Sequence, residues 1–389
     1  DLTRACGAPP RDEPLLEMLS PKVINDLAPA PHSIKAPVSD AQATQGGREI
    51  HLSLGALRRY LECPLQGAAQ YALGMVDEDD GSDEDPGNEP LDQTQLDRVV
   101  LLRDAFWAGR GELEAARRQF DQAMRLHQLQ GRAPVGPFAE AITTAFARRL
   151  DLCVGQARAL KIASLAGWER IRIGGAAEEI AAADRVLEPI VLDVPMRPGD
   201  GDNTMLRIAL RATISVSAGR DASINCIARD SGAMPYHFLG GFLSAMVLAA
   251  GGETRARYFN AIVVGSSKDS VEPAKLCRTL KIPTPEQATT YLAGLAADLF
   301  SGRNHYFLPF EAVAEIVRRK KGARWPARRE ITDIIESIRQ NDFARCRSDY
   351  GPVRNSRDYP PPPSDEVVEI IKRRFQPIMT IFAKVPGER

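Results

Sequence analysis

The sequence predicts a mixed α/β protein in which a small group of strands lies between regions made mainly of helices. Apolar residues first recur at the three- and four-residue spacing of amphipathic helices, between Leu52 and Lys161. The pattern then changes to short β-branched runs with partial two-residue alternation, between Pro189 and Gly265. Helical spacing returns from Pro285 onward. The predicted order in the centre is helix, strand, strand, strand, helix, strand.

The composition is that of an ordinary globular protein. The chain has 389 residues, of which 44% are hydrophobic and 26% charged, and this length is sufficient for two or three domains with cores of their own. The formal net charge of -1 excludes a binder of the strongly basic kind. Any contact with nucleic acid must therefore come from local patches.

The six cysteines occur without a CxxC or CxxH pair, which argues against a structural zinc site and against a disulfide framework. We therefore expect a reducing, cytoplasmic location, no bound metal and no cofactor. No run of 18 apolar residues and no signal peptide is present, so we expect no membrane contact. The chain begins with Asp1 rather than Met, and we expect it to be the C-terminal piece of a larger protein.

Changes in composition divide the chain into four predicted regions. We expect a linker over residues 1–48, a helical region over 49–165, an α/β core over 166–305 and a C-terminal helical region over 306–389. Within the helical region, the acidic tract Asp77 to Glu89 (DEDDGSDEDPGNE) predicts a solvated loop because its like charges repel. A metal-binding role is the alternative, but the ligand spacing of a calcium loop is missing.

Ser53 is a good N-cap for a first helix that runs to Glu62, after which Pro64 interrupts it. Periodic apolar positions predict the other helices, over residues 91–108, 112–129, 138–161, 285–301, 310–321, 327–340 and 365–383.

The predicted strands are short and rich in β-branched residues; they are Pro189 to Met196, Leu206 to Ser217, Ala222 to Ala228 and Tyr258 to Gly265. The segment Tyr236 to Ala250 is too long and too uniformly apolar for an ordinary strand, so it predicts a buried helix.

This α-β-β-β-α-β order is that of the restriction-endonuclease-like, or PD-(D/E)XK, nuclease core. Such a nuclease needs an Asp near the end of the second strand, and an acidic residue and a Lys spaced by one on the third, to hold Mg²⁺ and orient the attacking water. Here Thr213 lies in the second strand, near the position where the Asp is needed. The third strand ends in IARDSG, which places Ala228 at the position of the acidic residue and Asp230 at the position of the Lys. We therefore predict no catalytic residues.

An alternative interpretation keeps the chain as an active Mg²⁺-dependent nuclease. The carboxylates of Asp184, Asp193, Asp221 and Asp230 would then have to rearrange into a displaced metal site. Other catalytic patterns are missing, because the chain has no GxSxG motif, no dinucleotide fingerprint and no GxxxxGK[ST] phosphate loop. Energy for any unwinding of DNA must come from a partner.

Several segments resemble the C-terminal region of the RecC family, the gamma chain of exodeoxyribonuclease V. The segments are LSLGALRRYLECPLQGAAQYALGM, PLDQTQLDRVVLLRDAFWAG, IARDSGAMPYHFLGGFLSAMVLAAGG, YFLPFEAVAEIV, RSDYGPV and FQPI, and in this order they span roughly Leu52 to Ile378. The resemblance implies a degenerate nuclease-like domain that guides or splits DNA strands in double-strand break repair and recombination. It also implies RecB-like and RecD-like helicase partners in an ATP-dependent helicase–nuclease complex. The chain lacks the later cysteine trio with which the similar AddB-type chains hold an iron–sulfur cluster.

The most basic local stretch, named here the basic segment, is a candidate DNA contact. It contains Arg318, Arg319, Lys320, Lys321, Arg324, Trp325, Arg328 and Arg329. Lys and Arg neutralise phosphates, and an indole ring can stack on an unpaired base, so the segment predicts a contact with a single strand or a fork. The alternative for this segment is a solvated helix end with Trp325 in the core. A separate hypothesis for the whole chain is a protein-interaction module that does not bind DNA.

Overall fold

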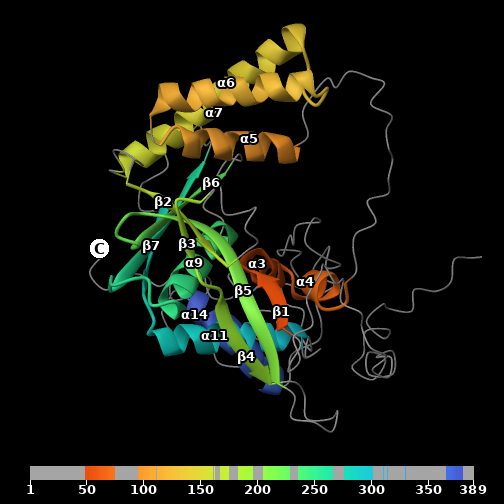
Figure 1. Cartoon of the computed structure of the whole chain (residues 1–389), viewed down its shortest axis with the longest axis vertical. Coiled ribbons are helices and arrows are strands. Elements are labelled where there is room, and N and C mark those ends of the chain that lie inside the picture. Colours follow the sequence, from red (N-terminus) through yellow and green to blue (C-terminus); the bar gives the residue numbers. More distant parts are fainter. Residues whose placement is uncertain are drawn as a thin grey trace, which may run out of the picture.

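The computed structural model describes residues 49–74, 95–110, 112–160, 162, 167–174, 183–195, 205–227, 235–265, 276–300, 310, 313, 329 and 365–379. These residues form an eight-stranded mixed sheet with helices against both of its faces (Figure 1). The fold is therefore mixed α/β, as the sequence predicts.

The longest strand, β5 (Met205–Val216), organises one half of the sheet. Strands β2 (Glu169–Ile173) and β4 (Ile190–Pro195) both run antiparallel to it, β2 beside residues 212–216 and β4 beside residues 205–210. The two behave as one strand interrupted by the intervening residues, which include the short β3 (Arg185–Leu187) parallel to β2. Strand β1 (Glu49–Ser53) is parallel to β5.

The other half of the sheet continues from β5 through an antiparallel pairing with β6 (Ala222–Ile227). Strand β7 (Tyr258–Gly265) is parallel to β6, and β8 (Cys277–Lys281) is antiparallel to β7. A parallel pair needs a crossover connection. The 3₁₀ turn η2 (Pro235–Phe238) and helix α9 (Leu239–Ala250) supply it here.

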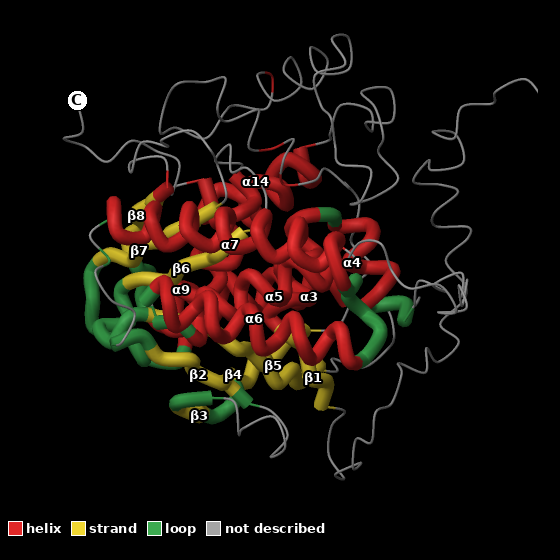
Figure 2. Tube along the Cα trace, turned by 90° about the horizontal axis from the view of Figure 1, so that it is seen from above, coloured by secondary structure: helices red, strands yellow, loops and turns green. Residues whose placement is uncertain are grey.

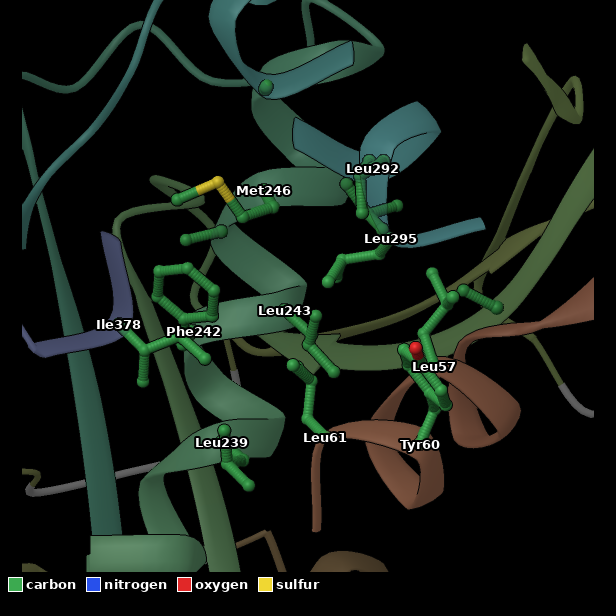
Figure 3. Packing of buried hydrophobic residues seen from close by; sticks show 14 of the residues in the cluster. Leu57, Tyr60, Leu61, Leu239, Phe242, Leu243, Met246, Leu292, Leu295 and Ile378 are labelled. Carbon is green, nitrogen blue, oxygen red and sulfur yellow. The ribbon is translucent and has the colours of Figure 1, made fainter. Parts of the chain in front are cut away.

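One face of the sheet packs against the main core, which joins α9 to helices from distant parts of the chain. These are α3 (Leu54–Glu62), α4 (Pro64–Tyr71), α11 (Pro285–Phe300) and α14 (Asp365–Met379). Figure 3 shows Leu57, Leu243 and Leu295 from three of these helices gathered in this core. Helix α3 begins where Ser53 Oγ accepts a hydrogen bond of 3.1 Å from the Ala56 N–H.

The opposite face of β6 and β7 is covered by a layer of helices, seen at the top of Figure 1. The layer consists of α5 (Gln95–Ala108), α6 (Leu113–Leu129) and α7 (Gly136–Ala159). Phe120 and Phe146 stack between α6 and α7 with ring centroids 5.0 Å apart. The side chains of Ala222, Ile224 and Val264 point from the sheet into this layer.

The strands predicted around β4, β5, β6 and β7 are confirmed, as are the buried helix before β7 and the helix from Asp365 as far as Met379. The sequence reading missed β1, β2, β3 and β8, which have five residues or fewer and are too short to produce a firm period. The linker, the acidic tract and most of the helices predicted over 310–321 and 327–340 lie outside the described residues. Of the helices that the structure describes, none combines the length and apolarity needed to cross a membrane.

Candidate functional site on the open face of the sheet

The helical layer leaves half of its face of the sheet uncovered. Val216 lies opposite Ser223 in the β5–β6 ladder, so the odd-numbered residues of β5 share the face that α5, α6 and α7 cover on β6. Among these odd-numbered residues only Ala209 is buried. The even-numbered residues from Leu206 to Val216 are all buried. We name the open face as the odd-numbered residues of β5 with their register partners on β1, β2 and β4.

Thr213, the position where a nuclease of the predicted type needs an Asp, lies exposed on this face. Its register partner on β2 is Arg172, whose Nη1 donates a hydrogen bond of 2.6 Å to Thr213 Oγ1. The Nε of Arg172 donates to the carbonyl oxygen of Gly174 at 3.0 Å, which fixes the guanidinium group. A positive charge held at this position opposes a divalent cation and favours an anion.

Two more arginines lie beside this pair. Arg170 is in register with Ser215, and Arg211 precedes Thr213 by two residues on the same face of β5. Gly174 makes room for this arrangement, because an added Cβ would lie 2.9 Å from Pro189 Cβ and 3.3 Å from Arg211 Cγ. Its φ of +60° also belongs to the left-handed region that favours glycine.

Of the four carboxylates proposed for a displaced metal site, the three that the structure describes form no metal-binding group. Asp184 accepts a hydrogen bond from the Arg170 backbone N–H at 2.7 Å, and Asp193 lies across the β4–β5 ladder from Arg207. Asp221 belongs to the β5–β6 turn, where it accepts a hydrogen bond of 2.6 Å from the Ser217 hydroxyl. Within the described part of the chain, no three His, Cys, Asp or Glu side chains are placed to hold a metal ion.

Most of the other predicted site residues fall where the structure gives no description. Ala228 and Asp230, the degenerate positions of the third strand, lie outside the described residues. The same holds for the basic segment, namely Arg318, Arg319, Lys320, Lys321, Arg324, Trp325 and Arg328. Arg329 is described, and it is helical and exposed. The basic segment therefore stays a prediction.

The sequence reading missed the arginines of β2. The signal was present in the alternation Arg170, Ile171, Arg172, Ile173, which puts both arginines on one face of a strand and both isoleucines on the other. The isoleucines are buried and the arginines are half-buried, in agreement with that alternation. Only four residues alternate, and this run is too short to be distinguished from a loop by its period.

Two comparisons with known proteins identify no relative of this chain. The sequence matches no protein-family model and none of the curated proteins. The resemblance to the RecC family consequently remains a prediction based on the order of its segments.

Proposed function

We propose that this chain is a noncatalytic DNA-binding and scaffold part of an ATP-dependent helicase–nuclease complex that acts in double-strand break repair and recombination. In this role it guides or splits DNA strands while RecB-like and RecD-like partners unwind the duplex. The observation that carries the proposal is the contact between Thr213 and Arg172, which puts a fixed cation where a nuclease of the predicted type needs a metal-binding carboxylate.

The order of elements supports a restriction-endonuclease-like origin for the core. Along the chain, α3 is followed, after the helical layer and β2–β3, by β4, β5, β6, α9 and β7, which is the α-β-β-β-α-β order read from the sequence. The strands are adjacent in space in the same order, since β5 pairs with β4 and β6, and β6 pairs with β7.

The open face supports a role in binding rather than in hydrolysis. Hydrolysis of phosphodiesters by this class of enzyme depends on Mg²⁺ held by carboxylates, which activates water and shields the phosphate. Arg172 instead places a positive charge at this position, held by hydrogen bonds to Gly174 and Thr213, and a positive charge attracts a phosphate group. Such a surface can hold a DNA strand without cutting it.

The test uses the full chain with labelled single-stranded and double-stranded DNA in the presence of Mg²⁺. We expect binding that weakens as salt increases, because phosphate contacts release counterions, and we expect no cleavage. Replacing the basic residues of the basic segment by Ala should weaken binding and reduce its salt dependence.

Two outcomes would reverse the proposal. Cleavage that Asp221→Ala or Asp230→Ala abolishes would show an active nuclease with displaced carboxylates. An absence of DNA binding at any salt concentration would identify a protein-interaction module instead.

A further inference from the structure

Arg172 is one of three arginines near Thr213 on the open face; the other two are Arg170 of β2 and Arg211 of β5. We propose that Arg170, Arg172 and Arg211 bind the phosphodiester backbone of a single nucleic-acid strand. The inference rests on the proposed function, and it adds a contact surface that is separate from the basic segment.

The register of the sheet brings these side chains together. Arg172 lies opposite Thr213 and Arg170 lies opposite Ser215, so both arginines of β2 face the same side as Arg211 of β5. Directly opposed residues on antiparallel strands have Cβ atoms about 5 Å apart. The guanidinium groups and the two hydroxyl groups therefore form one continuous polar surface.

Two of these three arginines, Arg170 and Arg211, have no carboxylate partner among the described residues. The described interactions include no ion pair and no side-chain hydrogen bond for Arg170 or Arg211. Asp184 accepts from the backbone N–H of Arg170, but its ion pair is with Arg110, at 3.5 Å. Adjacent like charges on a sheet destabilise it, so a bound polyanion would remove an energetic cost of the folded state.

The donors on this surface match phosphate oxygens. Arginine offers a planar set of N–H donors, and the Thr213 and Ser215 hydroxyls add the kind of contact that commonly positions nucleic-acid backbones. Arg170 and Arg172 are separated by two residues, or roughly 6.6 Å along the strand. That separation is close to two nucleotide steps, each of which rises about 3.4 Å along the axis of a stacked strand.

The rest of the open face favours a single strand over a duplex. Val186 and Val191, which are 42% and 38% exposed, are in register with Arg172 and Ala209, and the exposed His51 is also in register with Ala209. Apolar side chains and an imidazole ring can contact the faces of unpaired bases. A duplex presents no such faces, and its major groove admits a helix or a two-stranded ribbon rather than the face of a wide sheet.

The experiment measures binding of the full chain to a fluorescein-labelled oligothymidylate and to a duplex of equal length, over a range of salt concentrations. The test variant is Arg170→Ala with Arg211→Ala. The matched control is Arg125→Ala with Arg132→Ala, which removes the same charge from exposed positions on α6 and the turn that follows it. Arg170→Lys with Arg211→Lys keeps the charge but loses the planar donor set.

The test variant should bind the oligothymidylate at least about tenfold more weakly, because it loses the charge-assisted hydrogen bonds of two arginines to phosphate. The slope of log Kd against log salt should fall by about 0.7 for each phosphate contact, or about 1.4 in all. The control should leave affinity and slope unchanged, and the lysine variant should keep the slope while losing affinity.

Equal losses in the test and control variants would overturn the inference, because they would show a general charge effect. Unchanged binding in the test variant would overturn it as well, while binding that still depends on the basic segment would leave the proposed function intact. Duplex binding as strong as single-strand binding, and equally sensitive to the test variant, would overturn the choice of a single strand. A wild-type chain that binds neither DNA would contradict the proposed function itself.

Discussion

Removing one carboxylate from the main core should detach helix α14. Asp298 of α11 is 4% exposed and pairs with Arg374 of α14, which is 1% exposed, through a hydrogen bond of 2.8 Å. The guanidinium carbon of Arg374 also lies 5.0 Å from the centre of the Tyr60 ring. The substitution Asp298→Ala removes the buried carboxylate that this arginine contacts.

The size of the effect follows from that burial. Removing one partner of a buried ion pair costs about 3–5 kcal/mol, because the remaining charge stays in the interior. For a large domain 1 kcal/mol lowers Tm by about 2 °C or more, so the variant should melt at least about 6 °C below the wild type. Arg373, which also contacts Asp298, is 55% exposed and can recover water when the carboxylate is lost.

The measurements are thermal and urea unfolding, both followed by far-ultraviolet circular dichroism, with limited proteolysis to report the release of α14. Arg117→Ala is the matched control, since its ion pair with Asp151 is 37% and 39% exposed and, like other exposed pairs, should contribute little to stability. The double variant Asp298→Leu with Arg374→Met should recover most of the lost stability, because neither charge remains. A loss for Asp298→Ala no larger than that for Arg117→Ala would refute this reasoning.

Other substitutions test the packing and titration of single residues. Burial raises the pKa of Tyr60 far above its usual range. The neutral Tyr60 side chain therefore contributes its full stability below about pH 10, and this contribution is lost as the pH rises further. The substitution Tyr60→Phe should make the decline of Tm above that pH less steep. Gly241→Ala should lower the free energy of chemical unfolding by about 1–3 kcal/mol, because the new Cβ would lie 2.6 Å from Ala261 Cβ. Gly294→Ala should leave the free energy of unfolding unchanged or raise it, because its new Cβ would meet no atom within 4 Å. Gly174→Ala should lower Tm and weaken binding of the oligothymidylate together, because a φ of +60° is strained for any side chain.

Strong local patterns made the centre of the fold predictable. The run LGGFLSAMVLAA is apolar on every side, and α9 is indeed buried almost throughout. The alternation in β5 indicated a strand with one buried face, and its even-numbered residues lie in the main core. In both elements the local period and the burial in the fold agree.

The candidate site could be predicted only in part. Thr213 was identified as a position without a carboxylate, but its partner Arg172 lies 41 residues away in the sequence, on a strand too short to predict. The register of β2 along β5 decides that contact, and a one-residue shift would turn Arg172 to the other face. Long-range register depends on packing against the whole core, which no local window of sequence contains.

The position of α14 has a consequence for how the chain is made. The main core combines α3, which begins at residue 54, with α14, which ends at residue 379, so some of its contacts join residues separated by most of the chain. During synthesis the ribosome releases α3 and α9 long before α14 exists. Their apolar surfaces lack this partner until residues 365–379 emerge, and exposed apolar surface makes a partly folded chain prone to aggregation. The main core can therefore be completed only after α14 has been synthesised.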